Sequence, residues 1–329
     1  MRRTLAGILF ASIVAVLAVG TLSSQATKLA SAHTVTPAEY EKWKRDLSNW
    51  GRWGQDDQIG ALNLITAAKR KQAAALVREG YSVSIAGDAD IVKAIDNPNP
   101  YELKMLTIGT DQITVNYHGI AHTHLDSLAH INDNGVFYNG YKPDADKVLK
   151  QGHASNSIHN VKNGIFTRGI LIDIPRLKGV PYLEPGTPIY VEDLEAWENK
   201  AGVKVSSGDA LLVRTGVWAR RKALGPWLRG RAEGGRSAGL DPSVIPWLKQ
   251  RDIAILGSDH PQYVSPSSLR GAVHDFALLY LGVHLLDNCD LEALADAAAA
   301  RRRWEFLLTA APLPIVGGTG SPVNPIATF

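Results

Sequence analysis

The segment Tyr117-His118-Gly119-Ile120-Ala121-His122-Thr123-His124-Leu125-Asp126-Ser127-Leu128-Ala129-His130 holds four of the ten histidines in the chain, together with an aspartate. In extended backbone, side chains two residues apart lie on the same face. Neutral imidazole and carboxylate groups are preferred ligands of divalent ions such as Zn²⁺ and Mn²⁺. The alternative is a solvated strand edge, which would carry Lys and Glu rather than so many histidines. The segment therefore predicts a metal site with four potential ligands on one face, interrupted by Ile120: His118, His122, His124 and Asp126.

The composition is that of an ordinary globular protein. The 329 residues are 45% hydrophobic and 20% charged, which is enough chain to bury a sizeable core. The formal net charge is only +3, and the one dense basic run, Arg301-Arg302-Arg303, follows an Ala-rich helical stretch. We interpret that run as a solvated helix face, so we expect no nucleic-acid partner.

Residues 1–32 have the features of a secretory signal peptide. Two arginines precede the sixteen apolar residues 5–20, and small residues follow, with cleavage expected after Ala26 or Ala32. The alternative is an uncleaved anchor, but the apolar stretch is short of the ~20 residues that span a bilayer. We therefore expect an exported, periplasmic or extracellular protein without stable membrane insertion after processing. A single cysteine, Cys289, excludes an internal disulfide and suits such a compartment.

The rest of the chain alternates buried-type strands with helices, which favours an α/β fold in one compact domain over residues 47–329. Residues 33–46 predict a linker that becomes a helix, with Thr36 as its N-cap before Pro37. An exposed loop or lid is expected at 225–240, and a long helix or a helix-to-strand passage at 271–286. The other expected helices are 66–80, 191–197 and 241–249, and the expected strands are 81–85, 169–174, 210–215, 253–257 and, as a final strand, 313–316.

A catalytic Zn²⁺ or Mn²⁺ site needs at least three protein ligands and an open position for water. The histidine-rich segment supplies two or three of them. The best distant candidates are His274, just before an apolar run, and Asp287, just after it. Spacing alone does not select this pair, because a histidine beside an apolar helix is more often a core residue.

From about Leu47 to Phe329 the chain resembles the cyclase-like metal-dependent hydrolases, a family that includes bacterial kynurenine formamidase and isatin hydrolase. The family motif, His-x-Gly-Thr-His-x-Asp-x-x-x-His, is specific because it fixes the spacing of four chemically demanding positions. The resemblance implies a swivelling β/β/α fold, with a mixed-sheet or barrel-like β core and flanking helices, and a homo-oligomer. It rests on Asn49-Trp50-Gly51-Arg52-Trp53-Gly54, Thr123 to His130, Leu212-Val213-Arg214-Thr215-Gly216, Gly257-Ser258-Asp259 and the His274-to-Asp287 segment.

The resemblance also implies roles for individual residues. His124 and Asp126 fall on metal ligands, and the aspartate is able to bridge two ions. His130 falls on the nearby acid/base group. His274 completes a second metal position together with a following acidic residue, for which Asp287 is the candidate.

Two departures from the family pattern bear on the number of ions. The first ligand histidine of the family falls on Ile120, which cannot bind metal. Either His118 or His122 can take its place, since an extended strand puts both on the ligand face; His122 is nearer in sequence to the bound pair. Asp287 stands where a glutamate is usual and is one methylene shorter. The site therefore holds either one ion or two, and its nitrogen and oxygen ligands suit Zn²⁺ and Mn²⁺ alike.

By resemblance, the expected activity is hydrolysis of an amide, formamide, cyclic amide or lactone bond in a small molecule. A metal-activated water attacks the carbonyl, and His130 carries the proton from the water to the leaving group. A serine-hydrolase route through a Gly-x-Ser-x-Gly turn is not expected. Two alternatives stay open: a polyketide-type cyclase or dehydratase on the same metal site, and an exported non-catalytic metal- or ligand-binding protein, for which Ile120 is the reason.

Five further residues are candidates for contact with the substrate. Trp50 and Trp53 either wall an aromatic or apolar substrate or pack in the core. Arg214 either clamps a substrate carboxylate or forms a structural ion pair at the end of a strand. Asp259 and His260 follow a strand, in a position where loops often carry function.

Overall fold

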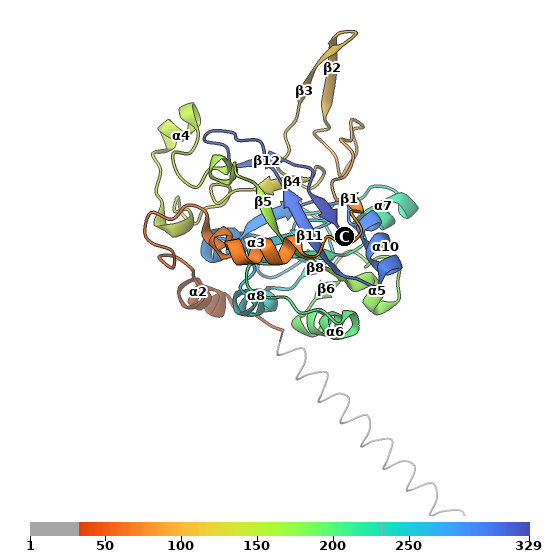
Figure 1. Ribbon diagram of the computed structural model, residues 1–329. Helices are drawn as coiled ribbons and strands as arrows, with labels where there is room; N and C mark the ends of the chain where they lie inside the picture. Colours follow the sequence, from red (N-terminus) through yellow and green to blue (C-terminus); the bar gives the residue numbers. More distant parts are fainter. Residues whose placement is uncertain (1–32, 232) are drawn as a thin grey trace, which may run out of the picture.

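Four parallel strands form the middle of the sheet in the computed structural model, which describes residues 33–231 and 233–329 (Figure 1). They are β5 (Ile165–Asp173), β7 (Ala210–Arg214), β9 (Ile255–Ser258) and β10 (His284–Asp287), in this order across the sheet. β7, β9 and β10 are buried along their whole length, because helical connections cover a parallel sheet on both faces. These strands confirm the expected α/β class.

Antiparallel strands extend this centre on both sides into a nine-stranded mixed sheet. Beyond β5 lie β11 (Glu305–Ala310), β13 (Ile326–Thr328) and β1 (Ser82–Ser84). Beyond β10 lie β4 (His124–Asp126) and the edge strand β12 (Gly320–Pro322). The histidine-rich segment thus enters the sheet beside β10 by three residues only.

Helices flank the sheet, and some expected bounds need correction. α2 (Pro37–Asp46) begins as expected, with the Thr36 side chain as its cap. α3 (Ala67–Ala74) stops short of residue 80, because the N–H groups of Glu79 and Gly80 bond to the carbonyl of Phe329 instead. The remaining helices are α4 (Ala145–Gln151), α5 (Ile174–Lys178), α6 (Val191–Ala201), α7 (Val217–Leu224), α8 (Ile245–Arg251), α9 (Ala272–Phe276), which continues as a π-helix over Ala277–Leu281, and α10 (Glu292–Arg301); 3₁₀ turns lie at Gly60–Leu64, Tyr138–Gly140, Ile158–Val161 and Pro242–Val244.

Two strand and loop expectations differ from the structure. Residues 313–316 are not a strand, since prolines at 312 and 314 offer no N–H to a ladder; β12 and β13 form after them. The 225–240 segment is not simply an exposed loop: Arg229 is buried, and β8 (Gly239–Leu240) pairs with β6 (Pro188–Ile189). The 271–286 segment is the helix-to-strand passage, from α9 to β10.

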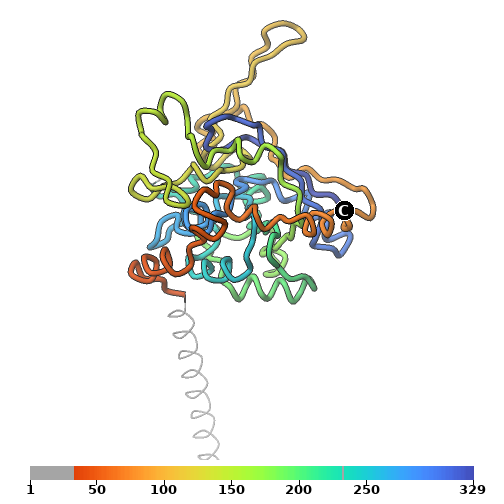
Figure 2. Tube along the Cα trace, turned by 60° about the vertical axis from the view of Figure 1, so that its left-hand side comes forward, coloured from red at the N-terminus to blue at the C-terminus, as the bar shows by residue number. Residues whose placement is uncertain are grey.

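A two-stranded ribbon, β2 (Glu102–Thr107) and β3 (Thr110–Thr114), stands away from the body in both views (Figures 1 and 2). Within the described residues, no helix combines the length and apolar character needed to cross a membrane. The predicted signal peptide, residues 1–32, lies outside the described part of the chain.

Candidate metal centre

The register of β4 against β10 brings ligand side chains from distant parts of the sequence together. His124 lies opposite Asp287 across the two strands. His124 and Asp126 alternate with Leu125 and therefore share one face of β4. His274 joins them from α9, immediately before the π-helix that leads into β10.

Asp126 is fully buried at the centre of this group, with imidazole nitrogens on several sides. Its Oδ1 lies 3.0 Å from His118 Nδ1 and 3.3 Å from His124 Nε2. Its Oδ2 lies 3.4 Å from His274 Nε2 and 3.8 Å from His130 Nε2. Among the described residues, neither oxygen has a hydrogen-bond partner, and neither does His118 Nδ1. Buried polar atoms without partners are costly, so this arrangement fits a bound cation.

Within residues 33–231 and 233–329, two groups of three side chains are close enough to hold an ion, with ligand atoms within 4.8 Å of one another. One group is His124, Asp126 and Asp287, and the other is His118, Asp126 and His130. His274 Nε2 also lies 3.6 Å from Asp287 Oδ2. Imidazole and carboxylate donors suit ions of the Zn²⁺ or Mn²⁺ type. Asp126 belongs to both groups, so the arrangement is compatible with one ion or with two.

Outer partners fix the orientation of the candidate ligands, as is usual around a metal. His124 Nδ1 donates to the carbonyl of His122 at 2.8 Å, which leaves Nε2 as the nitrogen that faces Asp126. His274 Nδ1 donates to Asp275 Oδ1 at 3.1 Å. Gln262 Nε2 donates to Asp287 Oδ1 at 2.6 Å. The sequence does not predict that Gln262 and Asp275 are partners of the candidate ligands. For Asp275, the only indication in the sequence is its position next to His274.

The carboxylates control protonation in the centre. Burial disfavours a charged His124, but Asp126 and Asp287 outweigh burial and raise its pKa to about 9. The pKa of His274 is raised in the same way, against burial, by Asp126, Asp275 and Asp287. Protons on these imidazoles occupy the positions that a cation would take, so metal binding should release them.

His130 differs from these two histidines. Burial and the neighbouring imidazoles, chiefly His118, lower its pKa to about 4 even though Asp126 opposes them. Its ring stacks on His118, with centroids 4.1 Å apart and planes 6° apart. His130 is therefore neutral near pH 7 and keeps a nitrogen lone pair available.

His122 is turned away from the centre, so the expectation that four ligands share one face is wrong for this residue. Its Nε2 donates to the carbonyl of Asn99 at 2.9 Å, and its ring meets Tyr101 edge-on at 4.6 Å. The physical reason is that only His124–Asp126 is strand, so alternation does not extend back to residue 118. His118 reaches Asp126 from irregular backbone, with its Nε2 2.9 Å from Thr319 Oγ1.

Arg214 and Asp259, two candidates for substrate contact, are held by the scaffold instead. Arg214 pairs with Asp173 at 2.9 Å and with Glu292 at 2.7 Å, which is the structural ion pair of the two alternatives. Asp259 is fully buried and accepts hydrogen bonds from the backbone N–H groups of residues 215–217 and from the Thr215 hydroxyl. Their carboxylate and guanidinium groups are thus already occupied within the fold.

Arg214→Leu should therefore affect stability rather than substrate binding. Removing the buried guanidinium leaves Asp173 with only the half-exposed Arg176 as an ionic partner, and we expect the free energy of unfolding to fall by about 3–5 kcal/mol. Arg176→Leu is the matched control, because Arg176 contacts the same carboxylate from a half-exposed position; we expect a loss of about 1 kcal/mol or less. Urea unfolding measures both. A variant of normal stability but raised KM would instead support the substrate clamp.

The remaining candidates for substrate contact are placed as follows. Trp50 donates from its indole N–H to the carbonyl of Leu279 at 2.6 Å and stacks on Tyr280, and Trp53 packs against the core with Arg52 over its ring. These contacts favour core packing. His260 is fully buried; its Nδ1 donates to the carbonyl of Pro261, and its Nε2 has no hydrogen-bond partner among the described residues.

A Gly-x-Ser-x-Gly pattern does occur in the chain, at Gly235-Arg236-Ser237-Ala238-Gly239. Ser237 is fully buried, and its Oγ accepts from the N–H of Gly230 at 3.1 Å. The segment continues into the short strand β8 rather than into a helix. It is not the exposed strand-to-helix turn that a serine nucleophile requires.

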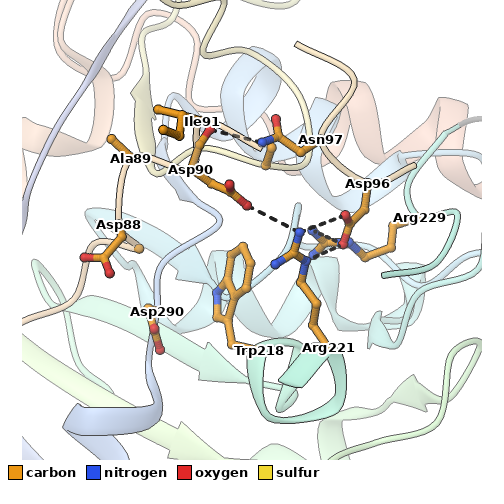
Figure 3. Close-up of a pocket in the computed structure, with 12 residues that line it drawn as sticks. Asp88, Ala89, Asp90, Ile91, Asp96, Asn97, Trp218, Arg221, Arg229 and Asp290 are labelled. Atoms are coloured by element: carbon orange, nitrogen blue, oxygen red, sulfur yellow. Dashed lines mark hydrogen bonds and ion pairs between the residues drawn. The ribbon is translucent and has the colours of Figure 1, made fainter. Parts of the chain in front are cut away.

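A cavity of about 420 Å³ borders the segment that leads into β4, since Ala121 is one of its lining residues. Figure 3 shows Trp218, Arg221 and Arg229 in its wall. Arg221 and Arg229 converge there on Asp96, at 2.8 and 3.4 Å. Arg229 also donates to the carbonyl of Ile120 at 2.9 Å. This ion-paired wall fixes the backbone at the position where the resemblance expects a ligand and the chain has isoleucine.

Comparison with known proteins gives three kinds of match. The family described as putative cyclase matches residues 31–263. A solved structure described as a novel cyclase is 32% identical, covers 86% of this chain and 100% of its own, and superposes with a TM-score of 0.78. Isatin hydrolase A from Labrenzia aggregata, in complex with benzyl benzoate, and isatin hydrolase A from Ralstonia solanacearum superpose with TM-scores of 0.55, at 19% and 18% identity, over 78% and 79% of this chain and 94% and 95% of theirs. At this identity the likeness to the two isatin hydrolases concerns the fold alone.

Among curated proteins, the kynurenine formamidase of Geobacillus thermodenitrificans (strain NG80-2) is 27% identical over 114 residues. The match spans 35% of this chain and 46% of the relative, which is less than half of its length.

Proposed function

From the premise that this chain belongs to the putative cyclase family, we propose that it is a metal-dependent hydrolase of C–N bonds in small molecules. The observation that carries the proposal is Asp126, a fully buried carboxylate. Its oxygens have no hydrogen-bond partner among the described residues and lie within 3.8 Å of four imidazole nitrogens. The names of the relatives, kynurenine formamidase and isatin hydrolase, support an amide, formamide or cyclic amide as the substrate; a lactone is the oxygen counterpart.

The proposed centre holds Zn²⁺ or Mn²⁺ through His124, Asp126, Asp287 and His274, with His118 beside the same aspartate. When bound, the ion supplies Lewis acidity, which polarises a carbonyl group and acidifies a neighbouring water. Asp126 is a member of both candidate groups, so its carboxylate would be a ligand whether one ion or two are held. The 3.0 Å contact between His118 Nδ1 and Asp126 Oδ1 supports His118 in the position that Ile120 leaves without a ligand, and it favours a catalytic centre over a non-catalytic binding protein.

His130 is the proposed proton carrier. Its neutral ring can accept a proton from the attacking water and return it to the leaving nitrogen. Its Nε2 lies 3.8 Å from Asp126 Oδ2, at the side of the centre where His118 stacks on it. We also propose that residues 1–32 direct export of the protein.

A panel of N-formyl anilines, cyclic aryl amides, lactones and esters, read by mass spectrometry, tests the reaction class. Hydrolysis opens a cyclic amide or lactone to a single product that is heavier than the substrate by one water. It splits a formyl aniline or an ester into two products whose masses add up to the substrate plus one water. Products that have lost water, or a rearranged isomer, would instead support the cyclase or dehydratase reaction. No turnover of any compound by the metal-loaded protein would contradict both.

We expect His130→Ala to lower kcat by roughly 10²–10⁴-fold while metal remains bound, because proton transfer contributes about that factor and other ligands hold the ion. Elemental analysis of the same sample that is assayed separates the two effects. Unchanged hydrolysis with full metal content would show that His130 carries no proton. Metal lost together with activity would show that it is a ligand.

A further inference from the structure

The candidate metal centre is most open to solvent at His118 and His130. Their side chains keep 25% and 24% of their surface exposed. The other candidate ligands are at most 6% exposed: His124, Asp126, His274 and Asp287. A substrate therefore approaches the centre past the stacked rings of His118 and His130.

A basic segment of the 225–240 loop, Arg229-Gly230-Arg231, lies against this centre. Arg229 donates to the carbonyl of Ile120 at 2.9 Å. Gly230 lies directly on the Ile120 side chain, because a Cβ atom at this glycine would come within 2.7 Å of Ile120 Cγ2. The segment is thus fixed at the position where the family resemblance expects a metal ligand and this chain has isoleucine.

Arg231 is held one contact away from a candidate ligand. Its Nη2 donates to Asp275 Oδ1, the oxygen that also accepts from His274 Nδ1. Its guanidinium lies over the ring of Tyr263, 5.4 Å from the centroid, and that ring meets His274 edge-on at 6.4 Å. The His274 ring in turn meets His130 edge-on at 5.8 Å, so Arg231 lies close to the open side of the centre.

The guanidinium of Arg231 keeps donors free for a ligand. Its side chain is 39% exposed, although Asp275 and Tyr263 both contact it. The hydrogen bond to Asp275 uses one of five N–H donors, and the flat fork of an arginine matches the two oxygens of a carboxylate. Because two contacts already hold the side chain in place, little conformational freedom is lost when it binds a second anion.

We propose that Arg231 binds a carboxylate of the substrate, so that the protein prefers amides that carry a negative charge. The inference rests on the proposed hydrolase and names the class of compound on which it acts. Between the centre and the guanidinium lie only the His274 ring and one oxygen of Asp275, an interval that an aromatic ring with a carboxylate can span. Arg231 thus takes the role of carboxylate clamp in place of Arg214, whose guanidinium is occupied within the fold.

Two formamides that differ by one carboxylate test the proposal: 3-formamidobenzoate and formanilide. For the metal-loaded wild type, we expect kcat/KM to be higher for 3-formamidobenzoate by roughly 10–100-fold, the usual effect of a hydrogen bond to a charged group. Arg231→Met should remove most of this preference by raising KM for 3-formamidobenzoate. Arg231→Lys should retain part of it, because the charge remains while the flat fork is lost.

Arg301→Met is the matched control. Arg301 likewise pairs with a carboxylate, that of Glu79 at 2.9 Å, and lies over a tyrosine ring, that of Tyr81, but it belongs to α10. The control should keep the wild-type preference for 3-formamidobenzoate. Urea unfolding confirms that each variant is folded.

Binding of the product 3-aminobenzoate, measured by isothermal titration calorimetry, gives a readout that does not depend on turnover. Arg231→Met should raise the Kd of 3-aminobenzoate by roughly 10–100-fold. Elemental analysis of the same samples should show unchanged metal content, because Arg231 is in neither group of candidate ligands. Binding through the metal alone would be insensitive to this substitution.

The outcomes separate this inference from the proposed function. Equal kcat/KM for the two formamides in wild type would overturn the carboxylate site and leave the hydrolase standing. Equal losses for both formamides in Arg231→Met would show that Arg231 only positions Asp275 and His274, which also overturns the inference. Turnover of neither formamide, with binding of 3-aminobenzoate that depends on Arg231, would instead contradict the hydrolase and retain the carboxylate site.

Discussion

Asp126→Asn is expected to abolish stoichiometric metal binding and hydrolysis. Removing a residue that only hydrogen-bonds to a metal ligand lowers affinity or activity by roughly 10–100-fold. The loss in kcat/KM should be larger for Asp126, because Asp126 is itself a member of both groups of candidate ligands. The substitution keeps the shape but replaces one oxygen with an amide NH₂, which neither binds a cation nor balances the charge on His124 and His274. Elemental analysis and an amide-hydrolysis assay measure the two losses.

Asp133→Asn is the matched control for this substitution. Asp133 makes the same kind of ionic contact, with Lys44 at 2.8 Å and with the Tyr280 hydroxyl at 2.7 Å, but belongs to neither group of candidate ligands. The control should retain metal and activity. If Asp126→Asn kept both as well, the metal centre would be wrongly placed.

His118→Ala and His122→Ala should show which of the two histidines is the metal ligand, a choice that the sequence leaves open. His118→Ala is expected to lower metal affinity or activity by at least roughly 10-fold, because His118 Nδ1 faces Asp126 Oδ1. His122→Ala should leave metal stoichiometry unchanged. It should instead lower the free energy of unfolding by about 1–3 kcal/mol, since it removes a hydrogen bond from the carbonyl of Asn99.

Titration of each variant with Zn²⁺ and Mn²⁺, together with urea unfolding, measures both quantities. The reverse pattern, with metal lost only in His122→Ala, would mean that the 117–123 segment has a different conformation in the metal-bound protein.

The sequence predicts the class of fold and much of the sheet, because buried parallel strands are recognisable as short apolar runs between helices. The runs at 169–174 and 210–215 lie in β5 and β7 for this reason. Close spacing likewise pairs His124 with Asp126, since two residues of strand guarantee a shared face. The family resemblance, rather than the spacing, selects His274 and Asp287; the structure brings both beside Asp126 and His124, through the register of β4 on β10.

The sequence does not predict the contacts of side chains on irregular backbone, because no periodic pattern fixes where those side chains point. His118 lies beside Asp126 and also contacts Thr319, which is far away in sequence. His122 instead contacts the carbonyl of Asn99, which lies outside the helices and strands. The role of Arg214, substrate clamp or structural ion pair, is also not predictable from the sequence, because its partners Asp173 and Glu292 lie in separate parts of the chain. Gln262 belongs to no recognisable motif, and only its hydrogen bond to Asp287 in the structure identifies it as part of the site.

The most direct test of the central claim is elemental analysis of the purified full-length protein, paired with amide hydrolysis before chelation, after chelation and after return of the ion. We predict stoichiometric Zn²⁺ or Mn²⁺, hydrolysis that chelation abolishes, and recovery when that ion is restored. Protein that carries no stoichiometric divalent metal, and whose activity does not respond to chelation, would contradict the assignment of a metal-dependent hydrolase.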